Sequence, residues 1–322
     1  MKIAFVHAES EFNEDFFEEL RVSLPRHELL SWKLGKQPPA TDFELAIVMG
    51  KFTRDEMSTQ PKLRLIQTAS AGYDGIDIDA ASEMGIWVAY SPSGETGNAI
   101  SVAEFAVLLL LGASRSLNQV VQPPRSTIEV PVLATALYGK TVCIVGLGTI
   151  GRLLAERLKP FGVILLATDD HPQEVPEGVK VFKNAQMKEA LAEADYVVLC
   201  VRATAENENL INASVLKAMK KGAVFVNIAR GSLVDEPALI EALESGQLAY
   251  AGLDVVKDEP VKPGNPLLAL HQVLVTPHVA GTTDINLKGM IAYVTRVVEG
   301  FSKDKLPKAL VNKPASPRVL FF

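Results

Sequence analysis

Three side chains that could carry out acid–base and anion-binding chemistry each follow an apolar, strand-like run in the second half of the sequence. They are Arg230 after Ala223–Asn227, Glu259 after Ala249–Asp254, and His278 after Val273–Thr276. If these runs are parallel strands of one sheet, their carboxyl ends lie along the edge where such sheets bind ligands. The pattern therefore predicts that a guanidinium, a carboxylate and an imidazole share one site.

The chemistry that suits these three groups is reduction of a carbonyl next to a carboxylate. Hydride transfer to a carbonyl builds charge on its oxygen, and a histidine can supply the proton there near neutral pH. A carboxylate on the other ring nitrogen favours the imidazolium, and an arginine can bind a substrate carboxylate through two parallel hydrogen bonds. The alternative is that each is an ordinary loop residue, which is how we interpret the other histidines, His7, His27, His171 and His271.

A glycine-rich turn upstream predicts where a cofactor binds. The predicted strand Thr141–Val145 is followed by Gly146-Leu147-Gly148-Thr149-Ile150-Gly151, a G-x-G-x-x-G turn that opens a helical pattern. Such a turn lets the backbone approach a pyrophosphate, which then lies at the amino terminus of the helix. We assign its three glycines, together with Thr149 and Ile150, to cofactor binding.

An acidic pair ends the next predicted strand, Val163–Ala167. Asp169 lies about 20 residues after the glycines, where an acid in this fold binds the ribose 2′-hydroxyl, and Asp170 follows it directly. Two adjacent carboxylates would repel a 2′-phosphate, so the sequence favours NAD over NADP. The alternative is that both acids belong to a solvated loop.

Strand and helix patterns alternate along both halves of the chain, which predicts parallel α/β sheets. In the first half the predicted strands are Lys2–His7, Leu45–Met49, Arg64–Thr68 and Ile86–Tyr90. In the second half we predict six, namely Thr141–Val145, Val163–Ala167, Tyr196–Val201, Ala223–Asn227, Ala249–Asp254 and Val273–Thr276. That number is expected of a doubly wound dinucleotide-binding fold.

Two long helical patterns flank the second half. Asn98–Ser116 is strongly apolar and is broken by Gln122–Arg125, whereas Asp284–Gly300 leads into the final segment. Because the first pattern is too apolar to face water, we expect it to be buried in a homodimer. The predicted domains are residues 1–97 with 286–322 for the substrate, and residues 98–285 for the cofactor.

Composition narrows the classes of protein. The 322 residues carry a formal net charge of −6 without a lysine and arginine block, which argues against a nucleic-acid partner. The longest apolar run, near Ala106–Ala113, is far shorter than the roughly 20 residues that span a bilayer, and the first residues lack a signal-peptide pattern. Cys143 and Cys200 lie in apolar strand patterns and indicate free thiols rather than a disulfide or metal site. We expect a cytoplasmic protein with no membrane or metal partner.

Together these segments resemble a known family, the D-2-hydroxyacid dehydrogenases. "NIARGSLVDE", "GLDVVKDEP" and "TPHVAG" are similar to the family's N-x-A-R-G-x-x-V-D-E, L-D-V-x-x-x-E-P and T-P-H segments. "ASAGYDGIDIDAASEMGI" resembles its substrate loop, and "NAISVAEFAVLLLL" resembles its inter-domain helix. The resemblance extends from about Leu63 to about Lys288, in the family's order and spacing.

The resemblance implies a fold and a set of roles. The fold would be two doubly wound parallel-sheet domains, a Rossmann NAD-binding domain inserted into a flavodoxin-like substrate domain. Arg230 would bind the substrate carboxylate and keto oxygen, His278 would be the acid–base, and Glu259 its partner. The remaining implied residues are Ala71, Gly72 and Tyr73, whose backbone would hold the carboxylate, and Ala229 and Asp254 beside the cofactor. The family also forms dimers around the helix that Asn98–Ser116 resembles.

Departures from the family bear on the substrate. Met49-Gly50 stand where phosphoglycerate-type members usually have Arg-Ser, and Glu259 stands where formate-oxidising members have Gln, so neither branch is favoured. Arg202 replaces a common Pro, and many members have a Trp within 119–138 that this chain lacks. Met49, Phe52 and Tyr73 are candidates for an apolar substrate pocket.

The sequence leaves more than one function open. The first is an NAD-dependent dehydrogenase that interconverts small 2-keto and D-2-hydroxy acids. The second is a non-enzymatic NAD-sensing binding protein, because the same fold serves as a corepressor in some lineages and can retain the same three residues. A dinucleotide- or S-adenosyl-type transferase is a third, which leaves Arg230, Glu259 and His278 without a role.

Overall fold

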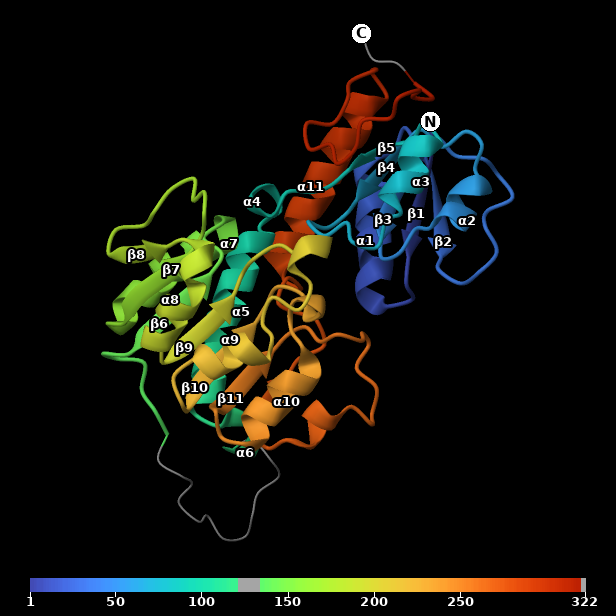
Figure 1. Cartoon of the computed structure of the whole chain (residues 1–322). Helices are drawn as coiled ribbons and strands as arrows, with labels where there is room; N and C mark the ends of the chain where they lie inside the picture. Colours follow the sequence, from blue (N-terminus) through green and yellow to red (C-terminus); the bar gives the residue numbers. More distant parts are fainter. Residues whose placement is uncertain (121–133, 320–322) are drawn as a thin grey trace. The chain divides into compact units, whose positions relative to one another are not determined.

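The structure is a computed structural model that describes residues 1–120 and 134–319. The chain divides into two compact units. Unit 1 consists of residues 1–98 and 283–322, and unit 2 of residues 99–282. Most of their helices and strands are labelled in Figure 1.

Unit 1 is built on a sheet of five parallel strands in the order β2-β1-β3-β4-β5. This is the flavodoxin-like order, in which the chain starts near the middle and reverses direction beside the first strand. The strands are β1 Lys2–His7, β2 Glu28–Lys33, β3 Leu45–Met49, β4 Leu65–Thr68 and β5 Trp87–Ala89.

Helices cover both faces of this sheet. The helices of the unit are α1 Glu11–Ser23, α2 Arg54–Ser58, α3 Ile78–Glu83, α4 Ser93–Thr96 and α11 Asp284–Phe301. One face is buried under α1 and α11, whose Phe16, Leu20, Val294 and Phe301 enter one core cluster. The other face packs against residues of α2 and α3.

The segment after α11 returns along the outer strand β5. Ala89 and Leu310 form an antiparallel bridge, and the Val311 N–H donates to the Val88 carbonyl at 2.8 Å. Arg318 Nη1 donates to the carbonyls of Gln60, Pro61 and Leu63. The returning segment thus covers the edge of β5, which would otherwise present unpaired backbone groups.

Unit 2 contains a sheet of seven strands in the order β12-β11-β10-β9-β6-β7-β8, and every neighbouring pair is parallel. The strands are β6 Thr141–Val145, β7 Ile164–Thr168, β8 Val179–Phe182, β9 Tyr196–Leu199, β10 Ala223–Asn227, β11 Leu248–Leu253 and β12 Val273–Val275. The predicted parallel α/β fold is therefore confirmed in both units.

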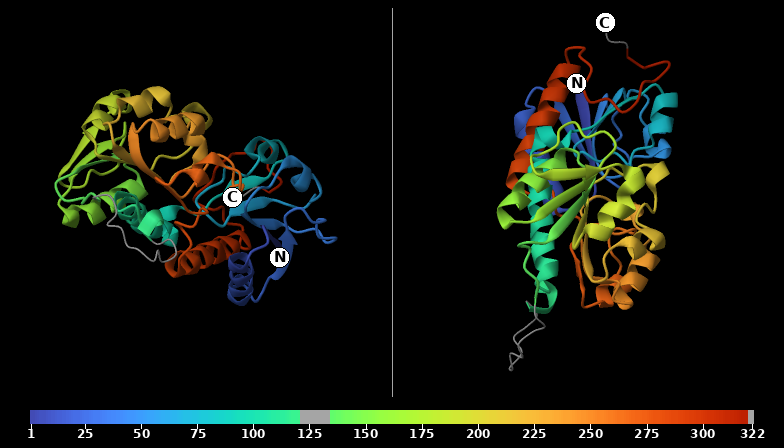
Figure 2. Two further views of the ribbon diagram at one scale, coloured as in Figure 1. Left: turned by 90° about the horizontal axis from the view of Figure 1, so that it is seen from below. Right: turned by 60° about the vertical axis from the view of Figure 1, so that its left-hand side comes forward.

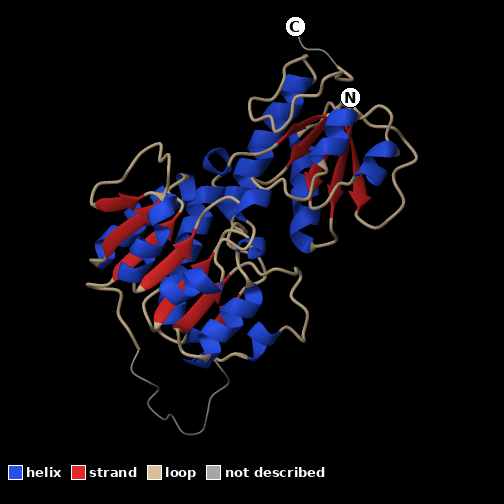
Figure 3. Cartoon of the chain, in the orientation of Figure 1, coloured by secondary structure: helices blue, strands red, loops and turns tan. Residues whose placement is uncertain are grey.

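The helices of unit 2 lie on both faces of its sheet (Figures 2 and 3). They are α5 Asn98–Ser114, α6 Leu117–Val120, α7 Thr149–Leu158, α8 Met187–Glu193, α9 Ala213–Ala218 and α10 Glu236–Glu244. Residues of α5 and α7 share one core cluster with the strands, and residues of α8, α9 and α10 share the other. A strand buried on both faces reads as a continuous apolar run, as in β10, whose five residues are all buried.

The sequence patterns missed two strands, β2 in unit 1 and β8 in unit 2. The predicted count of six strands in unit 2 is therefore wrong, because its sheet has seven. β8 has the sequence VKVF with one buried residue, and β2 has the sequence ELLSWK, also with one. Both lie at a sheet edge. Their charged residues and partial exposure give neither a continuous apolar run nor a strict alternation.

The predicted helix Asn98–Ser116 ends earlier, at Ser114. Ser116 adopts φ 52°, a left-handed conformation that a helix cannot continue through, and α6 follows. The expected break at Gln122–Arg125 lies outside the described residues. Within the part of the chain that the structure describes, no helix is both long and apolar enough to cross a membrane.

Candidate active site

The glycine-rich turn joins β6 to α7 in unit 2. Gly146 adopts φ +97°, and a Cβ there would lie 2.9 Å from the Val201 nitrogen. A Cβ on Gly151 would lie 2.2 Å from the Gly146 carbonyl oxygen. The first and third glycines are therefore required by the fold of the protein itself, through a left-handed turn and a close helix–strand contact.

The second glycine has a different environment. A Cβ on Gly148 would meet no atom within 4 Å, so packing within the protein does not demand a glycine there. Gly148 is the N-cap of α7 and no side chain caps this helix start, which leaves amide N–H groups available for an anion. Open space beside a helix amino terminus fits the pyrophosphate of a dinucleotide, which would be held by the backbone from Gly148 onward.

Asp169 and Asp170 have separate partners at the end of β7. The Asp169 carboxylate accepts the Leu147 N–H at 2.9 Å and the His171 N–H at 2.8 Å, so it fixes the glycine-rich turn against β7. Asp170 accepts the backbone and side-chain N–H groups of Asn184 at 2.9 and 2.8 Å. Asp169 is thus the acid adjoining the predicted cofactor site, whereas Asp170 holds the segment after β8.

Arg230 stands three residues beyond β10, in a turn that Asn227 shapes. The Asn227 side chain accepts the Ala229 N–H and donates to the Arg230 carbonyl, both at 2.9 Å. A Cβ on Gly231 would lie 1.9 Å from the Val256 carbonyl oxygen, so only glycine permits this close approach to the segment after β11. The backbone of Arg230 is therefore fixed from both sides, and its Nη1 donates to the Ala229 carbonyl at 2.7 Å.

Asp254, directly after β11, organises the loop that carries His278. Its side chain is 2% exposed and accepts hydrogen bonds from Thr276 Oγ1 at 2.6 Å, Val279 N–H at 2.9 Å and Ala280 N–H at 3.0 Å. The Asp254 carbonyl accepts the His278 N–H at 2.8 Å. His278 itself adopts φ 55°, an unusual conformation for a residue other than glycine, and these four hydrogen bonds hold it there.

The imidazole of His278 is paired with Glu259. His278 Nδ1 lies 2.7 Å from Glu259 Oε2, and the two side chains are 46% and 35% exposed. Burial raises the pKa of the Glu259 carboxyl, but the hydrogen bond and charge of His278, the Val256 N–H and the charge of Arg230 together bring that pKa below its ordinary value. The carboxylate form is favoured as a result, and Nε2 is the ring nitrogen left for chemistry.

The sheet brings the three predicted side chains to one edge. Arg230, Glu259 and His278 follow β10, β11 and β12, which are neighbours in the sheet, and all three strands run parallel. A cation, a carboxylate and an imidazole on adjacent loops can bind an anionic substrate and move a proton. The sequence missed the residues that position them, Asn227 and Thr276. The signal for Asn227 was its place at a strand end, where Asn side chains bond the next turn.

The residues that the resemblance assigns to the substrate carboxylate lie in unit 1. Ala71, Gly72 and Tyr73 follow β4 in a half-buried loop, and within the described residues neither the Ala71 nor the Gly72 N–H has an acceptor. The Tyr73 and Tyr90 rings pack with centroids 5.4 Å apart. The suggestion of Phe52 as a pocket residue is wrong, because its ring is fully buried and packs edge-on to Trp32 at 5.6 Å.

A family description, "D-isomer specific 2-hydroxyacid dehydrogenase, NAD binding domain", matches residues 107–280. The glyoxylate reductase of Pyrococcus furiosus is 34% identical over 314 residues, which cover 95% of this chain and 90% of that protein. The D-3-phosphoglycerate dehydrogenase of Methanocaldococcus jannaschii is 34% identical over 305 residues. That match covers 93% of this chain but 56% of the relative, so the chain spans little more than half of that protein.

A solved structure shares both the fold and the cofactor class. The NADPH-dependent glyoxylate/hydroxypyruvate reductase of Sinorhizobium meliloti, in complex with NADP and malonate, superposes with a TM-score of 0.83 at 29% identity. The match covers 99% of each chain. NAD or NADP is accordingly the cofactor, and the open turn at Gly148 fits it. On the family match and on relatives a third identical along nearly the whole sequence, the chain belongs to the D-isomer-specific 2-hydroxyacid dehydrogenase family.

Proposed function

We propose that the protein transfers hydride reversibly between NAD(H) and a small 2-keto or D-2-hydroxy acid. The observation that carries this proposal is the 2.7 Å contact between His278 Nδ1 and Glu259 Oε2. Glu259 lies on the loop after β11, next to the loop after β10 that holds Arg230. The glycine-rich turn lies in the same sheet, also at the carboxyl end of a strand. When bound, the nicotinamide supplies or accepts the hydride.

Each of the three side chains has one task in this proposal. His278 Nε2 donates a proton to the keto oxygen during reduction and removes it from the hydroxyl during oxidation. Glu259 keeps Nδ1 protonated and stabilises the imidazolium. The Arg230 guanidinium binds the substrate carboxylate and stabilises charge on the keto oxygen, so its effect is greatest in the transition state.

NAD is the proposed cofactor in preference to NADP. Asp169 lies at the end of β7 and its carboxylate also accepts the Leu147 N–H of the glycine-rich turn. A fixed negative charge there repels a 2′-phosphate and accepts a hydrogen bond from a 2′-hydroxyl. Ala229 and Asp254 remain proposed cofactor neighbours, and the structure adds that the Asp254 carboxylate is already used by the His278 loop.

Small substrates are the proposed class. The two unpartnered N–H groups of Ala71 and Gly72 support their proposed role in binding a carboxylate. The relatives named glyoxylate reductase make glyoxylate and hydroxypyruvate the first acids to test. The comparisons give no support to the non-enzymatic alternative, and it is not proposed further.

A kinetic panel tests this function. NADH oxidation should be measured with glyoxylate, hydroxypyruvate, pyruvate and a bulkier 2-keto acid. His278→Ala should lower kcat by roughly 10²–10⁴-fold. Arg230→Ala should raise KM and lower kcat, and Arg230→Lys should restore little, because an ammonium lacks the planar fork. Near-full activity of His278→Ala in both directions would contradict the mechanism.

We also propose that the protein is a homodimer formed through α5. Ile100 and Leu108 on this helix are 38% and 48% exposed, and Val107 and Leu111 on the same side are partly exposed. These apolar side chains, which share this side of α5 with the exposed Glu104, favour a self-complementary interface.

A further inference from the structure

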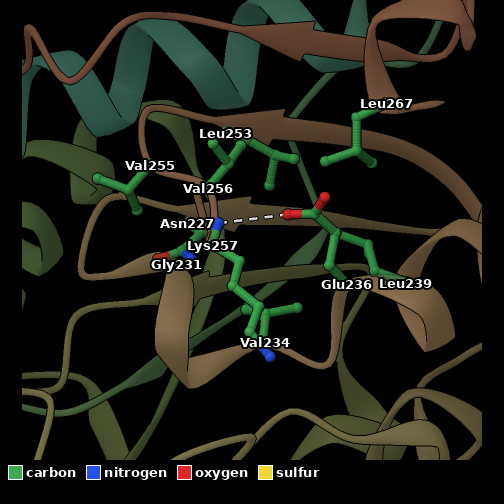
Figure 4. A pocket seen from close by; sticks show the side chains of 10 residues that line it. All are labelled: Asn227, Gly231, Val234, Glu236, Leu239, Leu253, Val255, Val256, Lys257 and Leu267. Atoms are coloured by element: carbon green, nitrogen blue, oxygen red, sulfur yellow. Dashed lines mark hydrogen bonds between the residues drawn. The ribbon is translucent and has the colours of Figure 1, made fainter. Parts of the chain in front are cut away.

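Glu236 joins the start of α10 to both ends of the loop that carries Glu259. Its Oε2 accepts the Lys257 N–H at 3.2 Å, and its Oε1 accepts a hydrogen bond from Asn265 Nδ2 at 3.0 Å. Figure 4 shows the first of these hydrogen bonds. Glu259 lies between the two attachment points, in a stretch without helix or strand.

Glu236 is itself held in place. It is the first residue of α10, directly after the N-cap Asp235, whose side chain accepts the Ala238 N–H at 3.3 Å. The side chain borders a cavity of about 10 Å³, which is also lined by Gly231, Val256 and Lys257 (Figure 4). The start of α10 therefore carries the acceptor for both ends of this loop.

The same loop reaches the turn of Arg230. Gly231 lies so close to the Val256 carbonyl that no Cβ fits between them, and the Val256 N–H donates to Glu259 Oε1 at 3.2 Å. Asn265 is in turn fixed, because its Oδ1 accepts the Leu267 N–H at 2.8 Å. Displacement of the loop between Lys257 and Asn265 would move Glu259 away from His278.

We propose that Glu236 is a positioning residue, which holds the 257–265 loop so that the Glu259 carboxylate reaches His278 Nδ1. This inference rests on the proposed acid–base pair but concerns a residue outside it. A competing role is simple: an acidic side chain at a helix start stabilises the helix through its dipole. The two roles differ in one respect, since only the first acts through Glu259.

A double-mutant cycle separates the two roles. Glu236→Ala should lower kcat of the reductase by about three- to thirty-fold and move the pH profile in the same direction as Glu259→Gln. The double variant should lose little more than Glu259→Gln alone, because residues that act through one another are not additive. Fully additive losses, or an unmoved pH profile, would overturn the proposal.

Two further variants complete the test. Glu236→Gln keeps one acceptor oxygen and should fall between the wild type and the alanine variant. Glu241→Ala removes an exposed carboxylate from the same helix and should leave kcat and the pH profile unchanged. If Glu236→Ala does not fold, Asn265→Ala removes the other half of the attachment and should shift the profile in the same direction.

Hydrogen exchange provides a readout that does not depend on turnover. Amides of residues 255–265 should exchange faster in Glu236→Ala than in Glu241→Ala. If the wild type reduced no 2-keto acid, the proposed function would fail while this exchange measurement still tested the attachment of the loop. Equal exchange in the two variants would overturn the inference even in a fully active enzyme.

Discussion

Replacing Asp254 with Asn should destabilise unit 2 and impair catalysis together. The carboxylate accepts two hydrogen bonds at Oδ1 and one, from the Ala280 N–H, at Oδ2. The amide of Asn can keep the two hydrogen bonds at its oxygen. Its NH2 group then faces the Ala280 N–H, so two donors meet and no hydrogen bond forms there.

The cost follows from the loss of that single charge-assisted hydrogen bond. A hydrogen bond to a charged group contributes about 1.5–3 kcal/mol to stability, which is close to the penalty for leaving a buried donor without an acceptor. The two figures describe the same loss and are not added. In a unit of this size each kcal/mol lowers Tm by about 2–4 °C, so Tm should fall by about 3–12 °C. We also expect kcat to fall by about tenfold or more, because the His278 loop loses its fixed position.

Differential scanning calorimetry and steady-state kinetics at one pH provide the measurements. Asp258→Asn is the matched control, because this aspartate is exposed four residues further along the same segment and its replacement should change stability by less than about 0.5 kcal/mol. An Asp254→Asn variant with unchanged Tm but weakened NADH binding would refute the positioning role and would favour direct contact with the cofactor instead.

Four more predictions concern the cofactor, pH and assembly. NADH should be preferred over NADPH by about tenfold or more in kcat/KM, since each 1.4 kcal/mol of repulsion or lost hydrogen bonding at Asp169 is a tenfold change. Asp169→Ala should bring the two kcat/KM values closer together. Equal kcat/KM values in the wild type would show that Asp169 does not contact the cofactor. Glu259→Gln makes the imidazolium less favourable, so the falling limb of reduction and the rising limb of oxidation should both move to lower pH. The pKa of Glu259 is lowered from 4.5 in the folded protein. The ionised carboxylate therefore stabilises the fold above about pH 4.5, and this stabilisation is lost as pH falls through the lowered pKa. The difference in Tm between the wild type and Glu259→Gln should accordingly shrink as pH falls, and a difference that grows would contradict the pairing. Leu108→Glu should yield monomers in sedimentation velocity at micromolar concentration, whereas a monomeric wild type would refute the proposed dimer.

The sequence predicts the buried strands well but misses two of the four edge strands, β2 and β8. β1, β3, β6 and β10 have the predicted bounds, because a strand buried on both faces needs apolar residues throughout. β2 and β8 face a neighbour on one side only, so Lys and Glu are tolerated in them and the pattern weakens.

For the site, residue types and motif order predicted which side chains gather, but not how they are held. The segment after β11 contains three acids, and its sequence alone does not tell which one turns inward. In the structure Asp254 is buried, Asp258 is exposed and Glu259 pairs with His278. Asp254 is held by N–H groups in the loop after β12, about 25 positions further along the chain, and Glu259 is held by the imidazole of His278, 19 positions away. Local patterns carry no information over such distances. The catalytic roles stay predictions.

The division of unit 1 into two segments has a consequence for synthesis on the ribosome. Residues 1–98 emerge first, but α11, which covers one face of their sheet through Met290, Val294 and Val298, emerges only after all of unit 2. At about 5–20 residues per second, residues 99–282 take about 10–40 s to be made. During that interval the apolar face of β1, β3 and β4 has α1 but lacks the part of its cover that α11 provides, whereas unit 2 is continuous and can complete its own core. We therefore expect the nascent chain to need chaperone protection chiefly for its first hundred residues, and the inserted unit to fold before the unit that begins the chain.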